Sequence, residues 1–320
     1  MGAQGGLEER LVPKAGFPLL LLRLGALKGQ SWVGRLRTLV RLPLAFLKGS
    51  WILLRFRPDC VLGVGGYASG PVVLLARMLG WLWGARTAIL EQNAVTGFSN
   101  RILGQVVHQI FVAFPGMEKQ FPGRSVVVTG NPVRESIVRL PSAARQPFVV
   151  FVFGGSQGAA GINTLVLDSL PILADLRGRV RWIHQTGEKD FDRVMNGHRD
   201  AGWSDSRVEK FIDDMPACYA QASLLVCRAG SSTLAEIAAV GRAAVLVPYP
   251  FASDNHQEKN ARIFTDAGAA RILIQGKATG RELADLIRSA VENPAGIDLI
   301  EKNALKFHRE NSAGLLASML

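Results

Sequence analysis

The sequence predicts an α/β protein built from two domains with parallel sheets. Short apolar runs that suit buried strands alternate with helical stretches along the whole chain. Glycine-rich turns follow three of these runs, at residues 65–70, 154–158 and 230. The length of 320 residues allows two hydrophobic cores, because domains of this class commonly contain about 100–200 residues.

The composition excludes several classes of protein. A hydrophobic content of 48% with 34 glycines and 15 prolines is typical of a globular chain and not of a disordered one. The three cysteines lie far apart without metal-ligand spacing, so we expect buried thiols in a reducing compartment. The five histidines are scattered and an HExxH motif is absent, so no metal site is predicted. No apolar run reaches the roughly eighteen residues that cross a bilayer.

The formal charge of +11 is concentrated near the N-terminus. The segment from Arg10 to Leu90 contains twelve Lys or Arg residues and one acidic residue, Asp59. Within residues 27–58 the basic side chains are mixed with apolar ones, including Trp32. This pattern suits a helix lying on an anionic membrane surface, and equally a helix with one core face and one solvated basic face. Nucleic acid is not expected as a partner, because no helix-turn-helix, zinc-finger or RRM-type signature is found.

In the first half of the chain we expect one parallel sheet. The expected strands are residues 17–22, 60–64, 87–90, 110–113 and 126–129, and the expected helices are residues 7–12, the basic stretch with a break near Pro43, and residues 71–82. Pro71 favours the start of a helix. Glu91, Gln92 and Asn93 follow the strand at 87–90, and open α/β sheets bind ligands at the carboxyl ends of their strands.

In the second half we expect another parallel sheet, after a linker at residues 139–146. The expected strands are residues 147–153, 181–185, 208–211, 224–227, 243–247 and 270–274, and the expected helices are residues 163–174, 217–222, 234–240, 263–267 and the chain from 279 with a break near Pro294. Strands that alternate with helices in both halves predict Rossmann-like topology in both domains.

The stretch from 226 to 260 carries the clearest chemical signal. Gly230 allows a tight turn after a buried strand, and we expect Ser231 to Thr233 to cap the next helix with their hydroxyls. The N–H groups of such a turn suit a diphosphate. Glu236 could accept hydrogen bonds from two ribose hydroxyls, or it could be a surface glutamate of an ordinary βαβ unit. The second glycine turn, at residues 154–158, strengthens the phosphate interpretation.

Eight motifs are spread over essentially all 320 residues: GGYASGP, EQNAVTGFSN, GNPVR, GGSQGA, HQTG, FIDDM, CRAGSSTLAEIAAVG and DNHQEKNA. In this order and at these distances they closely resemble the MurG family of glycosyltransferases. One short motif matches by chance often, whereas eight in the family's order are specific. The resemblance implies inverting transfer of N-acetylglucosamine from UDP-N-acetylglucosamine to undecaprenyl-linked muramoyl-pentapeptide, the lipid I to lipid II step of peptidoglycan synthesis, without a cofactor.

The resemblance also implies a cellular place and a fold. The family acts in cell-wall biogenesis, cell shape and cell division, as a peripheral protein at the cytoplasmic face of the cell membrane. Its GT-B fold has two Rossmann-like domains facing a cleft. In this chain we expect residues 1–133 to form the acceptor domain and residues 134–305 the donor domain. The C-terminal helix near 306–320 is expected to pack back on the first domain.

Site residues follow from the same resemblance. Ser156 would contact the donor phosphate, Ile212 would face the uracil through its backbone, and Glu236 would hold the ribose. Gln257 would hold the sugar, while Asn93 and Arg134 would close over the sugar and the diphosphate. The donor-binding residues expected are Asn93, Arg134, Ser156, Ile212, Ser231, Ser232, Thr233, Leu234, Ala235, Glu236 and Gln257. No DxD-like pair is expected in the site, so we expect no metal requirement.

One departure from the family concerns its first loop. The family begins with a strand and a loop close to GGTGGH, whose histidine is placed to act on the acceptor, and this chain shows no such loop. Roughly forty residues of the pattern are absent, so the N-terminal domain is expected to be incomplete. The catalytic base is therefore unknown, and Glu91 or His256 would have to serve as the base if this chain turns over at a normal rate. The alternatives are a UDP-sugar transferase with another lipid acceptor such as diacylglycerol, a UDP-N-acetylglucosamine epimerase, and an inactive truncated copy that binds donor.

Overall fold

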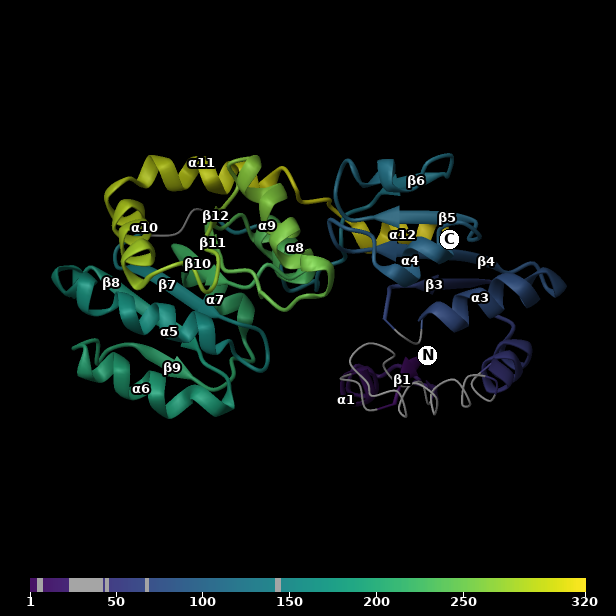
Figure 1. The fold of residues 1–320 in the computed structure, drawn as a ribbon, viewed down its shortest axis with the longest axis horizontal. Helices are drawn as coiled ribbons and strands as arrows, with labels where there is room; N and C mark the ends of the chain where they lie inside the picture. The colour runs from purple at the N-terminus through teal and green to yellow at the C-terminus, as the bar shows by residue number, and fades with distance from the viewer. Residues whose placement is uncertain (5–7, 23–42, 44–45, 67–68, 142–144) are drawn as a thin grey trace. The chain divides into compact units, whose positions relative to one another are not determined.

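A computed structural model describes the chain except residues 5–7, 23–42, 44–45, 67–68 and 142–144 (Figure 1). The chain divides into two compact units. The first comprises Met1–Thr129 with Ala313–Leu320, and the second comprises Gly130–Ser312. The boundary that the sequence predicts, between residues 133 and 134, stays a prediction.

The first unit contains a four-stranded parallel sheet. Its strands follow one another in chain order: β3 (Cys60–Gly63), β4 (Arg86–Glu91), β5 (Gln109–Val112) and β6 (Val126–Val128). A separate parallel pair, β1 (Gly2–Ala3) with β2 (Leu21–Leu22), flanks the helix α1 (Glu8–Lys14). The strand expected at 17–22 is therefore limited to its last two residues.

Helices cover both faces of the four-stranded sheet. Leu316 of α12 (Ser312–Met319) packs with Ala88, Leu90 and Phe111. On the other face, Val61 packs with the helical segment at residues 46–56 and with α3 (Ser69–Leu79). Alternating side chains of β3 thus point to opposite faces, as the pleat of a strand requires. A short 3₁₀ turn (Gly80–Leu82) follows α3, and α4 (Phe98–Leu103) follows β4.

The second unit contains a six-stranded parallel sheet. Its strands are β7 (Phe148–Phe153), β8 (Val180–Gln185), β9 (Arg207–Glu209), β10 (Leu224–Cys227), β11 (Ala244–Leu246) and β12 (Arg271–Ile272), arranged in the order β12-β11-β10-β7-β8-β9. Read from β9, this is the order 3-2-1-4-5-6 of a Rossmann fold. The predicted Rossmann-like topology is confirmed here, and the direction of winding reverses between β7 and β10.

Burial on both faces explains why β7 is apolar without interruption. Val150 and Val152 belong to a core shared with α5 (Ala160–Ser169) and α10 (Gly280–Glu292), whereas Phe151 and Phe153 contact Tyr219 on the other face. Central strands of parallel sheets have this pattern. The other helices of the unit are α6 (Phe191–Asp200), α7 (Met215–Gln221), α8 (Ser231–Val240), α9 (His256–Asp266) and α11 (Pro294–Leu305).

Several sequence-based predictions were wrong in detail. The N-cap of α8 is Gly230 and makes no side-chain cap hydrogen bond, so Ser231 to Thr233 form the first helical turn and do not cap it. Helix α6 was not predicted, because it buries only Val194 and His198 and its apolar pattern is sparse. The basic side chains Arg35, Arg37 and Arg41 lie outside the described residues. None of the helices in the described part is long and apolar enough to cross a bilayer.

Candidate functional site

Two glycine turns lie side by side at the point where the winding of the second sheet reverses. Strands β7 and β10 are paired so that Phe153 lies opposite Cys227, and each strand ends there. The turn at residues 154–159 leads into α5, and the turn at residues 228–230 leads into α8. Ligands of open α/β sheets bind at the carboxyl ends of the strands beside such a reversal. The topology therefore indicates a ligand site between these two turns.

The first turn is packed backbone to backbone against the loop after β8. Gly158 has a φ of 71°, and a Cβ there would lie 1.9 Å from the Thr186 carbonyl oxygen. A Cβ on Gly187 would lie 2.2 Å from the Gln157 carbonyl oxygen. Both positions therefore require glycine on steric grounds. Ser156 is exposed at the tip of this turn.

Gln185 connects the first turn to the segment that carries Ile212. The Gln185 side chain is buried at the end of β8, where its Nε2 donates to the Gly155 carbonyl at 2.9 Å. Its Oε1 accepts from the backbone N–H of Ile212 at 2.8 Å. Gln185 belongs to the HQTG motif, but no role was predicted for it from the sequence. A polar side chain at the end of a largely buried strand was the feature that could have identified it.

A buried histidine pair lies beneath the Thr186–Gly187 loop. His184 Nδ1 lies 3.2 Å from His198 Nε2, and His184 Nε2 lies 3.0 Å from Asn163 Oδ1. Asn163 Nδ2 in turn donates to the Thr186 carbonyl at 3.0 Å. Burial lowers the pKa of His198 to about 4. The pKa of His184 lies well below its usual value, first because the ring is buried and second because His198 is its neighbour. Both rings are therefore neutral near pH 7 and support the loop without a buried charge.

The second glycine turn, at residues 228–230, places the first helical turn of α8 at the site. Ser231 and Thr233 are half-buried, Ser232 is exposed, and the neighbouring Leu234 is buried. The first N–H groups of a helix have no partner within the helix and attract anions. Asn260 holds the turn from below, because its Nδ2 donates to the Ala229 carbonyl at 3.1 Å.

Glu236, one turn further along α8, has two partners. Arg134 Nη2 donates to Glu236 Oε1 at 3.1 Å, and the Tyr219 hydroxyl donates to Glu236 Oε2 at 2.8 Å. The side chain of Glu236 is 16% exposed and that of Arg134 is 56% exposed. The structure thus brings together two predicted site residues that lie 102 positions apart. Tyr219 was not singled out from the sequence.

The loop after β11 forms the far side of the second turn. Arg228 Nη1 donates to the carbonyls of Val247 and Pro248 at 2.9 and 3.1 Å, and its guanidinium lies over the Tyr249 ring at 5.4 Å. Gln257 Oε1 accepts from the backbone N–H of Tyr249 at 3.0 Å. These contacts attach Gln257 and its loop to the end of β10.

Asn93 belongs to the first unit, whereas the other predicted site residues belong to the second. Its backbone N–H donates to Glu91 Oε1 at 3.0 Å. Glu91 is buried, and its Oε2 accepts from Gly97 N–H at 2.9 Å and from Asn100 Nδ2 at 3.0 Å. This carboxylate therefore braces the loop after β4, which argues against Glu91 as a substitute base. His256 Nδ1 lies 2.7 Å from the Ser253 carbonyl oxygen.

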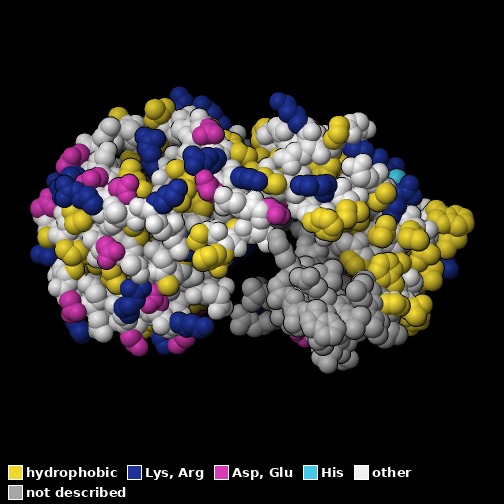
Figure 2. All heavy atoms as spheres, in the orientation of Figure 1, with side chains coloured by type: hydrophobic (Ala, Val, Ile, Leu, Met, Phe, Trp, Pro, Cys, Tyr) yellow, Lys and Arg dark blue, Asp and Glu magenta, His cyan; other side chains and the backbone are white. Residues whose placement is uncertain are grey.

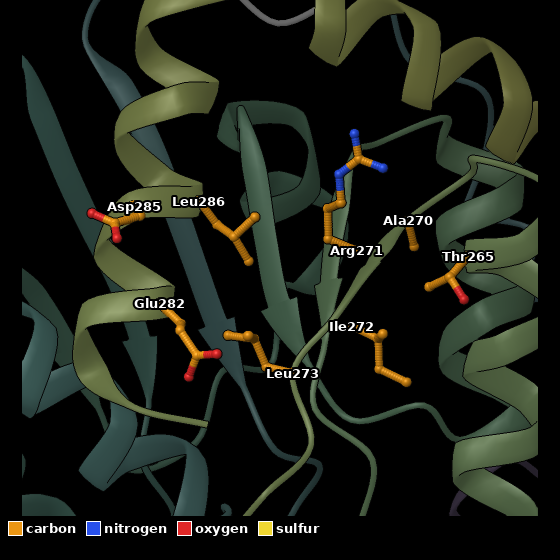
Figure 3. Close-up of a pocket in the computed structure, with 8 residues that line it drawn as sticks. All are labelled: Thr265, Ala270, Arg271, Ile272, Leu273, Glu282, Asp285 and Leu286. Carbon is orange, nitrogen blue, oxygen red and sulfur yellow. The ribbon is translucent and has the colours of Figure 1, made fainter. Parts of the chain in front are cut away.

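A separate hollow of about 480 Å³ lies at the edge strand β12 (Figure 3). Glu282, Asp285 and Leu286 line it from α10, and Thr265 lines it from α9. Strands β10 and β11 separate this hollow from β7. The Glu282 carboxylate in its wall is already hydrogen-bonded to Thr279 at the start of α10. Because the hollow lies away from the winding reversal, we place the candidate site at the glycine turns instead. Within the described ranges, no three His, Cys, Asp or Glu side chains are grouped to hold a metal ion.

Comparison with known families decides the family. Residues 149–314 match the glycosyltransferase family 28 C-terminal domain, and residues 1–112 match the glycosyltransferase family 28 N-terminal domain. The chain belongs to glycosyltransferase family 28. Both domain models of the family therefore match, one in each half of the chain.

Named relatives narrow the assignment within family 28. The chain is 44% identical, over its whole length and 83% of the relative's, to the UDP-N-acetylglucosamine--N-acetylmuramyl-(pentapeptide) pyrophosphoryl-undecaprenol N-acetylglucosamine transferase of Myxococcus xanthus. It is 48% identical to the protein of the same name from Anaeromyxobacter sp. strain K, over 92% of this chain and 76% of that one. The crystal structure of Acinetobacter baumannii MurG matches with a TM-score of 0.77 and 30% identity, covering 99% of this chain and 88% of that chain. The predicted membership of the MurG family and the predicted GT-B fold class are confirmed.

Proposed function

We propose that this chain transfers N-acetylglucosamine from UDP-N-acetylglucosamine to the N-acetylmuramyl-pentapeptide that is linked through pyrophosphate to undecaprenol, converting lipid I to lipid II. Family membership supports the reaction. The single observation that carries the proposal for this chain is the pairing of two glycine turns at the winding reversal, with Glu236 one helical turn beyond. That arrangement suits a nucleoside diphosphate.

Each part of the donor has a proposed partner. The exposed backbone of the first turn at Ser156 and the first N–H groups of α8 would bind the diphosphate. Ile212 would face the uracil through its backbone, on a segment that Gln185 holds. Glu236 would accept hydrogen bonds from the ribose hydroxyls. The proposed donor-binding set is Asn93, Arg134, Ser156, Ile212, Ser231, Ser232, Thr233, Leu234, Ala235, Glu236 and Gln257.

The proposed reaction is a single displacement with inversion. A hydroxyl oxygen of the acceptor forms the new bond to the anomeric carbon, the bond from that carbon to the diphosphate oxygen breaks, and the hydroxyl proton passes to a base. Negative charge develops on the departing UDP. Backbone N–H groups at residues 156 and 231 and the guanidinium of Arg134 would stabilise that charge, which is where preorganised donors accelerate reactions most. Gln257 would hold the sugar during the step.

We propose a peripheral position at the cytoplasmic face of the membrane, and exposed apolar side chains of the first unit support contact with a membrane surface. Large apolar side chains are exposed on the helical segment 46–56 and near the end of α3, including Trp51 at 61% and Trp81 at 74% exposure. Arg55 lies over the Trp51 ring at 5.7 Å. Figure 2 shows hydrophobic side chains gathered on the first unit, where Figure 1 draws α3. Exposed tryptophans with basic neighbours suit the interface of an anionic bilayer.

Turnover with defined acceptors tests the proposed reaction. Purified protein is supplied with radiolabelled UDP-N-acetylglucosamine and, in separate reactions, with lipid I, with diacylglycerol or with no acceptor. We expect labelled lipid II only in the first reaction. Labelled glycolipid from diacylglycerol alone, or an epimerised nucleotide sugar without acceptor, would contradict the proposal. A chain that binds UDP-N-acetylglucosamine but transfers to neither lipid would identify an inactive donor-binding protein.

Vesicle binding tests the membrane-facing surface. Replacing Trp51 and Trp81 by Ala should reduce the fraction of protein that sediments with anionic vesicles, because each tryptophan side chain would bury apolar area in the membrane interface. Leu299→Ala is the matched control, since Leu299 is 60% exposed on α11 of the second unit. Equal binding by the double variant and the control would contradict this part of the proposal.

A further inference from the structure

We propose that Tyr219 is a positioning residue that holds the carboxylate of Glu236 in the orientation needed to grip the donor ribose. The inference rests on the proposed function, which assigns the ribose hydroxyls to Glu236. It adds a residue that does not itself touch the donor. It also gives different roles to the two partners of Glu236.

The geometry of the Tyr219 contact is that of a fixed support. Tyr219 is fully buried, and its hydroxyl donates to Glu236 Oε2 at 2.8 Å. A short hydrogen bond to an ionised carboxylate is about twice as strong as a neutral one, and burial protects it from exchange with water. Burial and the neighbouring Glu236 charge raise the pKa of Tyr219 well above its usual value, so its hydroxyl keeps its proton as a donor.

Tyr219 is held at both of its ends. Its ring makes edge contacts with Phe151 and Phe153, at centroid distances of 5.8 and 5.9 Å. Its backbone carbonyl accepts from Nε of the buried Arg242 at 3.1 Å. Arg242 lies just after α8, whereas Tyr219 lies on α7, so the segment that follows α8 holds the backbone of α7 at Tyr219. The hydroxyl position is therefore set by the core of the second unit.

Arg134 is the replaceable partner of Glu236. Its side chain is 56% exposed, so water competes with the guanidinium for its contact with Glu236. Each carboxylate oxygen can accept more than one hydrogen bond. When Arg134 turns from Glu236 to the diphosphate, Oε1 becomes available to the ribose hydroxyls while Tyr219 still holds Oε2. The ion pair thus occupies the ribose position until the donor arrives.

Calorimetric titration with UDP and with 2′,3′-dideoxy-UDP tests the role of Tyr219. Wild-type protein should bind UDP roughly 10- to 100-fold more tightly than the dideoxy analogue, because only UDP makes the charge-assisted bonds. Tyr219→Phe keeps the ring and removes only the hydroxyl. We expect it to weaken UDP binding about 3- to 10-fold and to leave binding of the analogue unchanged. Leu299→Ala, at an exposed position of α11, is the control, and thermal unfolding checks that both variants fold.

The outcomes separate the inference from the function on which it rests. Suppose that Glu236→Gln abolishes the difference in affinity between UDP and the analogue. If Tyr219→Phe then weakens the binding of both ligands equally, or of neither, the positioning role of Tyr219 is overturned. If wild-type protein and Glu236→Gln bind UDP and the analogue in the same ratio, the ribose assignment fails and the inference fails with it. Should Tyr219→Phe unfold, Glu236→Asp provides the second measurement. Because the Asp side chain is one methylene shorter and its carboxylate lies further from the Tyr219 hydroxyl, it should lose most of the discrimination, and retained discrimination would overturn the inference.

Discussion

A glycine turn follows the edge strand β3 in the first unit and the central strand β7 in the second, but glycine is required for different reasons. After β3, Gly65 and Gly66 have φ values of 89° and 80°, and a Cβ on either would meet no described atom within 4 Å. After β7, a Cβ on Gly158 would collide with the backbone of Thr186. Among the described residues, the first turn needs glycine for its backbone conformation. The second needs it also because two loops touch.

The same contrast holds for the glutamines that brace the loops. In the first unit, Gln120 Oε1 accepts from the backbone N–H and the hydroxyl of Thr96, and Gln120 Nε2 donates to the Ala94 carbonyl. Gln120 is exposed, whereas Gln185 of the second unit is buried. Water can replace the bonds of an exposed amide more readily than those of a buried one. The second unit therefore holds its loops with contacts that solvent cannot supply.

The largest effect is expected for alanine in the two turns. Gly158→Ala combines backbone strain with a clash against Thr186, so we expect a loss of about 3–5 kcal/mol in the free energy of unfolding. Gly66→Ala should cost only about 1–2 kcal/mol, the strain of a left-handed alanine. Urea denaturation of both variants measures the difference. Equal losses would show that the packed and open turns do not differ as described.

A smaller effect is expected for methionine at the two glutamines. Gln185→Met leaves the buried N–H of Ile212 without its partner, so we expect a loss of about 2–3 kcal/mol and faster hydrogen exchange at that amide. Gln120→Met should cost about 0.5–1 kcal/mol. Exchange measured by NMR at Ile212 and at Thr96 compares the two loops directly. Unchanged protection at Ile212 would remove Gln185 from the account of the site.

The buried histidines should make the second unit sensitive to acid. Because burial lowers the pKa of both His184 and His198, the unfolded chain takes up protons below pH 6.5 that the folded chain does not. Stability should therefore fall as pH decreases from 7 to 5, by up to about 1.4 kcal/mol per pH unit for each histidine. Burial and nearby arginines also lower the pKa of His108 on the first unit, so His108→Gln should reduce the slope as well, but by less than His198→Gln. Urea denaturation at pH 7, 6 and 5 measures the slopes, and a slope in His198→Gln equal to that of the wild type would refute the assignment.

The smallest effect on stability is expected at Arg134. Because the Arg134 side chain is 56% exposed, Arg134→Ala should change the free energy of unfolding by less than about 1 kcal/mol. Its affinity for UDP should nevertheless fall, since the proposed contact with the diphosphate is lost. Arg145→Ala is the contrasting variant, because the Arg145 side chain is only 14% exposed and pairs with the buried Glu301. A larger loss of stability in Arg134→Ala than in Arg145→Ala would contradict this ranking.

Sequence analysis was most successful where both faces of a strand are buried. Residues 224–227 form β10 as predicted, and β7 begins one residue later than expected. It was least successful for α6 and for the first turns of α9, which are largely polar. A polar helix with few buried side chains resembles a loop in sequence, because the periodic apolar signal is weak.

The sequence by itself determined the family, the alternation of strands and helices, and the glycine turns with Glu236, because these signals are local or follow a fixed order. Only the tertiary structure decided which groups support them. Tyr219 is 17 residues from Glu236, and Gln185 is 27 residues from Ile212. Gln185 and Ile212 meet because β8 and β9 are neighbours in the strand order 3-2-1-4-5-6. Tyr219 and Glu236 meet because the helices before and after β10, α7 and α8, pack so that the two side chains touch. Local pattern cannot specify that order, since it results from packing between elements distant in the chain.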